Sequence, residues 1–378
     1  MPEATLSLAR PITLLQPPRL EIGAGTIARL GEWAAAYKRI FVVAMAPTVG
    51  FVARAGLRGE IETYTDLPPE PDLPAVDNVL AAARAFRPDL VVGLGGGSVM
   101  DVAKLVAVLW DSEQSITDVV GVDKVSGRRT ALAQVPTTSG TGSEAGIRAL
   151  VTNPETLAKL AIESRHMLAD IAVLDPELTY SVPAPVTAAT GIDALAHCVE
   201  AFTSLKSHPL IDDYARMGIA LVGRYLARAV ADGSDTGARA GMMLASYYGG
   251  VCLGPVNTAG GHALAYPLGT RLKLPHGLAN AIIFPHVLAF NAPVRPEKTA
   301  TIMTALGLSG ATDEATVRSE SLAFCARLGV AMSLSAHGAA ADDLPVFATE
   351  AFAIKRLIDN NPRELTLADI EAIYRAAH

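Results

Sequence analysis

Two segments of this 378-residue chain carry residue types that bind metal ions. The first holds Asp193 and His197, and a helix would place both side chains on one face, one turn apart. The second holds His262 and His276, in a Gly-rich, apolar stretch with no opposite charge nearby in sequence. A buried Asp–His hydrogen bond would explain the first pair alone, because a buried polar group needs a partner. Four potential ligands in two segments instead favour a metal site.

The ligand types narrow the choice of ion. One carboxylate and three imidazoles suit Fe(II), Zn(II) or a similar divalent ion, and the absence of a thiolate argues against a structural zinc finger. His286 follows Pro285 near this segment but has no ligand partner at helical spacing. Cys198 directly follows His197, so a helix would turn it about 100° away; we expect it to pack.

A second kind of chemistry is indicated by Gly95-Gly96-Gly97-Ser98, which lies between an apolar, strand-like run and a helical pattern over residues 100–109. A strand, a Gly turn and a helix present free backbone N–H groups to a phosphate. We expect Ser98 to cap the helix, with Asp101 completing a capping box. The Rossmann spacing G-x-G-x-x-G is absent. A hydroxyl-rich loop over residues 136–144 suits hydrogen bonds to a ribose, amide or phosphate.

The elements that must position these residues divide the chain in two. The sequence predicts strands at residues 39–44, 61–65, 89–94, 131–135, 159–162 and 171–174, of which 39–44 and 89–94 are apolar enough to be buried. It predicts helices at residues 26–37, 52–57 and 75–86. Helical periodicity dominates from Val186 onwards. We therefore predict a dinucleotide-binding α/β domain over residues 1–180 and an all-helical metal-binding and substrate domain over residues 181–378.

Composition excludes several classes of partner. The net charge of −7 gives no reason to expect nucleic acid or an anionic membrane. Three scattered cysteines indicate a reducing compartment, and residues 1–5 show no signal-peptide pattern, so we expect a cytoplasmic protein. The uncharged stretches 241–261 and 277–294 are predicted to be buried helices rather than membrane spans.

These segments together resemble the iron-containing (group III) alcohol dehydrogenase family, within the dehydroquinate-synthase-like superfamily. The motifs that carry the resemblance span nearly the whole chain: residues 93–104, 136–144, 175–176, 191–200, 262–269, 275–280, 285–286 and 361–363. His276 follows His262 by fourteen positions, which matches the family's separation. The resemblance implies a Rossmann-like parallel-sheet domain, a C-terminal helical bundle and an active-site cleft between them.

The resemblance also implies roles for individual residues. It makes Asp193, His197, His262 and His276 ligands of Fe(II), with Zn(II) as an alternative. It assigns contacts with NAD or NADP to Gly95, Gly96, Gly97, Ser98, Asp101, Thr137, Thr138, Thr141, Lys159 and Leu174. It further implies a homodimer or higher homo-oligomer.

Two departures from the family pattern concern catalysis and cofactor choice. Many members have a second histidine four residues after the third ligand, whereas this chain has Tyr266, whose phenol can still donate a hydrogen bond at the reacting centre. Many NAD-preferring members end the second strand with an aspartate, whereas residues 43–48 contain no acid. NADP is then tolerated, although no Arg or Lys is there to attract its phosphate.

The resemblance predicts a metal-dependent, NAD(P)-linked alcohol dehydrogenase or aldehyde–ketone reductase. The metal would bind the alcohol oxygen while hydride passes between its carbon and nicotinamide C4. The alternative is a maleylacetate-type reductase or a hydroxyacid–oxoacid transhydrogenase, whose carboxylate substrates require a cation; Arg148 and Arg271 are candidates by position. A dehydroquinate-synthase-type lyase and a non-catalytic nucleotide-binding protein fit less well. Tyr247, Tyr248 and Phe284 are candidates for the substrate pocket.

Overall fold

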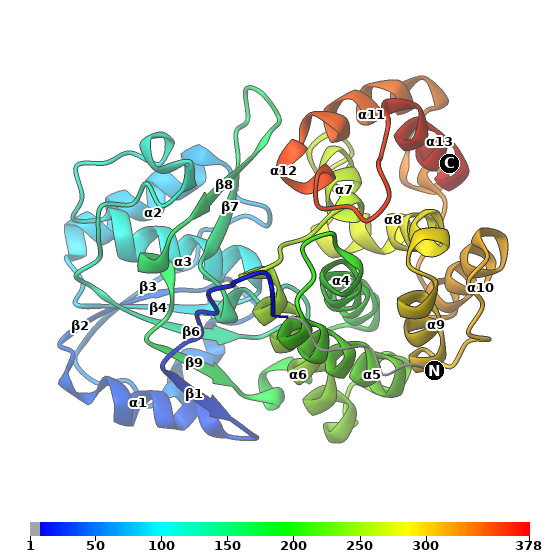
Figure 1. The fold of residues 1–378 in the computed structure, drawn as a ribbon. Helices are drawn as coiled ribbons and strands as arrows, with labels where there is room; N and C mark the ends of the chain where they lie inside the picture. The colour runs from blue at the N-terminus through cyan, green and yellow to red at the C-terminus, as the bar shows by residue number, and fades with distance from the viewer. Residues whose placement is uncertain (1–7) are drawn as a thin grey trace. The chain divides into compact units, whose positions relative to one another are not determined.

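The computed structural model describes residues 8–378. The prediction that residues 1–5 do not begin a signal peptide therefore falls outside the described residues. The chain forms two compact units. One contains residues 15–183 and 233–243, and the other contains, among the described residues, 8–14, 184–232 and 244–378. Figure 1 labels helices and strands of both units.

The first unit is built on a six-stranded, wholly parallel sheet with the order β1-β9-β6-β4-β2-β3. Its strands are β1 Arg19–Ile22, β2 Arg39–Val43, β3 Glu60–Tyr64, β4 Leu90–Gly95, β6 Ala131–Pro136 and β9 Ile171–Leu174. The predicted strands in this unit are confirmed. A smaller three-stranded sheet has the order β5-β8-β7 and contains β5 Gly121–Val122, β7 Arg148–Thr152 and β8 Lys159–Glu163.

Both faces of the six-stranded sheet are apolar because its central strands are buried on both sides. In β2, Phe41 and Val43 pack in one core with helices α2 (Leu73–Phe86) and α3 (Gly97–Leu109). The alternate residues Ile40 and Val42 pack in a second core on the other side. Short helices cover that side, including α1 (Arg29–Trp33). The continuous helix predicted over residues 26–37 is wrong, since α1 lies between two 3-10 turns.

The order of the strands reverses between β2 and β4. The chain moves outward from β2 to β3, then returns to the other side of β2 and continues through β4, β6 and β9. Such a reversal leaves a crevice at the carboxyl ends of the two strands where it occurs, here β2 and β4. The Gly95–Ser98 turn follows β4 at this edge.

The second unit contains helices and no strand among its described residues, which confirms the predicted helical C-terminal part. Its helices are α4 Ala184–Thr203, α5 Pro209–Ala231, α7 Gly260–Arg271, α8 His276–Asn291, α9 Pro296–Ala305, α10 Glu314–Arg327, α11 Leu344–Ala353, α12 Lys355–Ile358 and α13 Leu367–Ala377. Helix α6 (Thr236–Leu253) begins in the first unit and ends in the second.

Helix α4 is the central element of the second unit. Its side chains from Thr187 to Thr203 are almost all buried, and it packs mainly against α5 and α8. Helix α8 is also apolar throughout most of its length. Residues 276–294 are long and apolar enough to cross a membrane by length and composition, yet 83% of that window is buried inside the protein. That burial is typical of a core helix.

Candidate functional site

Helix α4 holds Asp193 and His197 on one buried face, as their spacing predicts. Their exposed fractions are only 1% and 3%. The distance between His197 Nε2 and Asp193 Oδ1 is 3.9 Å, which is too long for a hydrogen bond. The alternative of a simple Asp–His hydrogen bond is therefore wrong for this pair.

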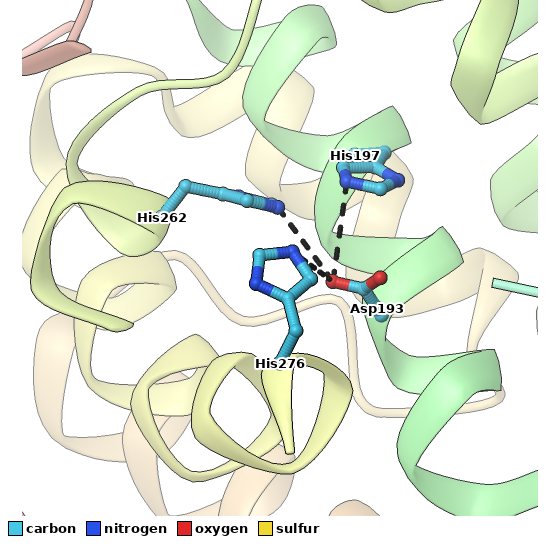
Figure 2. Close-up of side chains that lie close together, drawn as sticks. All are labelled: Asp193, His197, His262 and His276. Carbon is cyan, nitrogen blue, oxygen red and sulfur yellow. Dashed lines mark ion pairs between the residues drawn. The ribbon is translucent and has the colours of Figure 1, made fainter. Parts of the chain in front are cut away.

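Two further histidines approach the same carboxylate oxygen from other helices (Figure 2). His262, in the first turn of α7, has its Nε2 at 3.6 Å from Asp193 Oδ1. His276, the first residue of α8, has its Nε2 at 3.7 Å from the same atom. One potential ligand atom from each of the four residues lies within 4.8 Å of the other three. The structure thus brings together all four ligands predicted from sequence.

These separations fit a divalent ion at the centre of the cluster. Ligand atoms held about 2.1 Å from a tetrahedral ion lie about 3.4 Å apart. The three nitrogens lie 3.6–3.9 Å from Asp193 Oδ1, slightly beyond that value. The Nε2 atom of His262 is buried and has no hydrogen-bond partner, which would be costly unless a ligand occupies the site. The donor set therefore fits a metal ion.

The local sequence gives each histidine its position. His262 follows Gly260 and Gly261, and a Cβ on Gly261 would lie 2.3 Å from Glu200 Oε1, so only glycine lets that carboxylate approach the backbone. Pro275 precedes His276 and ends the extended segment before α8.

Glu200 contacts the cluster, although it is not among the residues predicted from the sequence. It accepts hydrogen bonds from His262 Nδ1 at 2.9 Å, from the His262 backbone N–H at 3.1 Å, and from the backbone N–H of Ala259. Because a carboxylate only accepts, Nδ1 carries the proton and Nε2 keeps its lone pair for a ligand. Glu200 lies seven residues after Asp193 on α4, so continuing the Asp193–His197 spacing by one turn would have identified it.

Asn280 is a second missed residue, on α8 one turn after His276. Its Nδ2 donates to Asp193 Oδ1 at 2.8 Å and lies 3.1 Å from His276 Nε2. This contact orients the carboxylate within the cluster. The Asn280 side chain is 2% exposed, so water does not compete for it.

The charges in the cluster favour a cation. Burial opposes ionisation of Asp193, but His197, His276 and His262 outweigh it and lower the pKa of Asp193. Burial likewise opposes a charge on His262, but Glu200 and Asp193 raise its pKa to about 10. A proton on this imidazole therefore balances the two carboxylates when no other cation does, and a divalent ion would replace it.

Tyr266 lies one turn after His262 on α7, and its side chain is 7% exposed. Its ring centroid is 6.1 Å from that of His276, so the phenol lies beside the cluster. Arg356 on α12 donates from Nη2 to Tyr266 Oη at 3.4 Å. The two arginines proposed from sequence are engaged elsewhere, because Arg148 pairs with Glu163 at 2.6 Å and Arg271 with Glu350 at 2.5 Å.

His286 does not belong to the metal cluster found among the described residues. Its side chain is nevertheless buried, with 2% exposed. Burial, with Arg318 as the second cause, lowers the pKa of His286 to about 4. It is therefore a neutral core residue of α8. Cys198 is also fully buried, as expected for packing.

The predicted phosphate-binding turn lies between β4 and α3. Helix α3 begins at Gly97 with Gly96 as its N-cap, and no side chain caps it. The predicted Ser98–Asp101 capping box is therefore wrong: Ser98 lies inside the first turn and its Oγ accepts from the Glu70 N–H. Asp101 accepts from Ser143 Oγ at 2.6 Å and from Leu150 N at 2.9 Å. The first-turn N–H groups of α3 still lack intrahelical acceptors, as at any helix start.

The hydroxyl-rich loop packs directly on this turn. The Thr137 N–H donates to Gly95 O at 3.0 Å. A Cβ on Gly97 would lie 2.7 Å from Thr141 Cγ2, and one on Gly96 would lie 3.3 Å from Thr138 Oγ1. Glycine at 97 is therefore required for this close approach. The structure thus brings the two predicted cofactor segments together.

A buried lysine ties the loop to α3. Lys104, 1% exposed, donates to Ser143 Oγ and to Arg148 O, both at 2.7 Å, and lies 3.6 Å from Asp101 Oδ1. Burial lowers the pKa of Lys104 and raises that of Glu144 to about 7. These residues are named the Lys104 cluster: Asp101, Lys104, Ser143 and Glu144.

The remaining predicted cofactor residues have different positions. Lys159 forms an ion pair with Glu70, whose N–H contacts Ser98, so it is linked to the turn. Leu174 ends β9 and is fully buried. After β2, Thr48 Oγ1 donates to Leu94 O at 3.1 Å, so the acid-free segment over residues 44–48 contacts the carboxyl end of β4.

Known protein families match nearly the whole chain. The model of iron-containing alcohol dehydrogenase matches residues 17–176, and that of the Fe-containing alcohol dehydrogenase family, C-terminal, matches residues 187–378. Long-chain-alcohol dehydrogenase 1 of Geobacillus thermodenitrificans is 38% identical over 98% of this chain and 97% of its own length.

Solved structures agree with these matches. A 1,3-propanediol oxidoreductase superimposes with a TM-score of 0.92 and 31% identity, covering 98% of this chain and 100% of its own. The sulfoacetaldehyde reductase of Bifidobacterium kashiwanohense, solved in complex with NAD+, has a TM-score of 0.86 and 27% identity, covering 98% and 99%.

Proposed function

Because the chain belongs to the iron-containing alcohol dehydrogenase family, we propose that it is a metal-dependent, NAD(P)-linked alcohol dehydrogenase or aldehyde–ketone reductase. The observation that carries the proposal is the convergence of Asp193, His197, His262 and His276 on one point. Fe(II) is the proposed ion, with Zn(II) as an alternative. The homo-oligomeric state and the cytoplasmic location stay predictions from the sequence.

The metal cluster and its neighbours have distinct roles in this proposal. A bound divalent cation would polarise the oxygen of an alcohol or carbonyl substrate, and the nicotinamide would accept or donate the hydride. Glu200 holds the His262 tautomer, and Asn280 orients Asp193. Tyr266 accepts from Arg356, so its own O–H proton is available to donate to the substrate.

The Gly95–Ser98 turn is the proposed pyrophosphate site. The N–H groups at the start of α3 would bind the phosphate oxygens, as helix N-termini do. Thr138 and Thr141, which border Gly96 and Gly97, are proposed to contact the cofactor beside the turn. The absence of an acid after β2 supports use of both NAD and NADP.

The test is metal removal and reconstitution. Chelated protein should lose aldehyde-dependent oxidation of NADH and NADPH, and Fe(II) or Zn(II) should restore it. Asp193→Ala should bind no ion and lose roughly a thousandfold in kcat/KM, because the polarisation of the substrate oxygen is worth several kcal/mol. Full activity in metal-free protein would contradict the proposal.

A further inference from the structure

We propose that Arg356, with Tyr266, forms a binding site for an anionic group on the substrate. The inference rests on the proposed function and narrows its substrate class to carbonyl compounds or alcohols that carry a carboxylate or sulfonate. Both groups offer oxygens in the geometry that a guanidinium recognises with two parallel hydrogen bonds.

The position of Arg356 is set by packing within the helical unit. The short helix α12 packs against α7, the helix that carries His262 and Tyr266. The guanidinium carbon of Arg356 lies 5.7 Å from the centroid of the Tyr266 ring. Since that ring is 6.1 Å from the ring of His276, the guanidinium carbon lies at most about 12 Å from the His276 ring, with the Tyr266 ring as their common neighbour.

This charge has no acidic partner. Among residues 8–378, no carboxylate lies within 4.0 Å of the Arg356 guanidinium, although Asp359 belongs to the next turn. Other arginines nearby in this unit are paired: Arg271 with Glu350, and Arg363 with Glu314 at 3.6 Å. The neighbouring Lys355 places its ammonium over Phe352 at 3.5 Å and adds positive charge. What distinguishes Arg356 is its contact with Tyr266, which lies one turn after His262 on α7.

The hydrogen-bonding capacity of the pair suits an oxyanion. Arg356 is exposed, and its single hydrogen bond among the described residues uses Nη2, so its other N–H groups are available. Tyr266 Oη accepts that bond, which leaves its proton free to donate. A substrate a few carbon atoms long would place its carbonyl at the metal cluster and its anionic end at Arg356.

A structural role would make different predictions. If Arg356 only holds Tyr266 in place, its loss would affect neutral and anionic substrates to the same extent. If it binds the anion, the loss would fall on anionic substrates and mainly on KM. The comparison of matched substrates therefore separates the two roles.

The experiment compares succinic semialdehyde and its sulfonate counterpart with butanal, using the metal-loaded enzyme and both cofactors. We expect the wild type to prefer the anionic aldehydes. Arg356→Gln should reduce the ratio of kcat/KM for anionic over neutral aldehyde roughly tenfold or more, mostly through KM, as hydrogen bonds to charged groups are lost. Arg356→Lys, which keeps the charge and loses the fork, should recover part of this ratio. The two anionic arms show whether carboxylate or sulfonate is preferred.

Arg375→Gln is the matched control, because Arg375 is an exposed arginine on α13 paired with Glu371. It should leave the ratio unchanged. Binding of succinate is measured in parallel by calorimetry, and Arg356→Gln should weaken it. An unchanged ratio in Arg356→Gln, or equal losses for butanal and succinic semialdehyde, would overturn the proposal. If no aldehyde is turned over at all, the proposed function fails, whereas the calorimetry still tests the anion site.

Discussion

The metal cluster and the Lys104 cluster both hold buried charged groups, and the two differ in how these charges find partners. Lys104 donates to Ser143 and Arg148 O at 2.7 Å and lies 3.6 Å from Asp101, so the charges in that cluster are balanced from within. In the metal cluster the three Nε2 atoms face one Asp193 oxygen at 3.6–3.9 Å, too far to bond with it.

The difference separates structural from ligand-binding polar groups. Buried groups at hydrogen-bond distance from each other hold two segments together. Buried groups that converge on a common point, just beyond that distance, leave room for an ion. Substitutions in the Lys104 cluster should therefore lower stability without changing metal affinity. Substitutions in the metal cluster should change metal affinity and have a smaller effect on the stability of the metal-free protein.

Lys104→Met should have the largest effect of the substitutions that test this difference, and the effect should be on stability. Loss of the ammonium removes the charged partner of Asp101 and the hydrogen bond from Lys104 to Arg148 O, which should destabilise the first unit by about 3–5 kcal/mol. Thermal denaturation of the metal-loaded protein would measure it. The exposed Lys38→Met should change little. Equal melting temperatures for the two variants would show that the cluster does not hold the loop.

Glu144→Gln tests the same cluster through pH. Burial raises the pKa of Glu144 from 4.5 to about 7, so the folded state keeps a proton that the unfolded chain releases between these values. Its stabilising contribution is thus complete below pH 4.5 and is lost as pH rises through about 7. The variant should gain up to about 3 kcal/mol relative to wild type between pH 5 and pH 8. Urea unfolding measures this.

The exposed Glu32→Gln is the control for that series and should follow the wild-type pH dependence. A Glu144→Gln curve that runs parallel to the wild type would rule out a buried, protonated acid at this position.

Glu200→Gln has the smallest expected effect and tests the metal cluster. The glutamine amide has the same shape as the Glu200 carboxylate but no negative charge, and its NH2 group would face a backbone N–H that the carboxylate now accepts from. The affinity for the metal should therefore fall roughly 10–100-fold. Competition between the protein and a chelator for Zn(II) measures it. The melting temperature of the metal-free protein should fall less than in Lys104→Met. Glu297→Gln, an exposed acid on α9, is the control. Unchanged affinity would mean that Glu200 does not orient His262.

Local patterns predicted much of this molecule. The strands and most helices follow from periodicity, and the Asp193–His197 pair from helical spacing. The capping box at Ser98 failed because the chain turns at Gly96 instead, and Asp101 is drawn to the N–H of Leu150 on β7. When a side chain has two available hydrogen-bond partners, tertiary packing decides which one it binds, and sequence spacing does not reveal the outcome.

By itself, the sequence determined the alternation of strands and helices, the Gly turn after β4 and the residue types that bind metals, because each depends on neighbours within one or two turns. Only the tertiary structure decided that three helices place their ligands around one oxygen, that Glu200 meets His262, and that Arg356 meets Tyr266. These contacts join residues 62 to 90 positions apart. Their distances depend on how whole helices pack, and no local spacing encodes that packing.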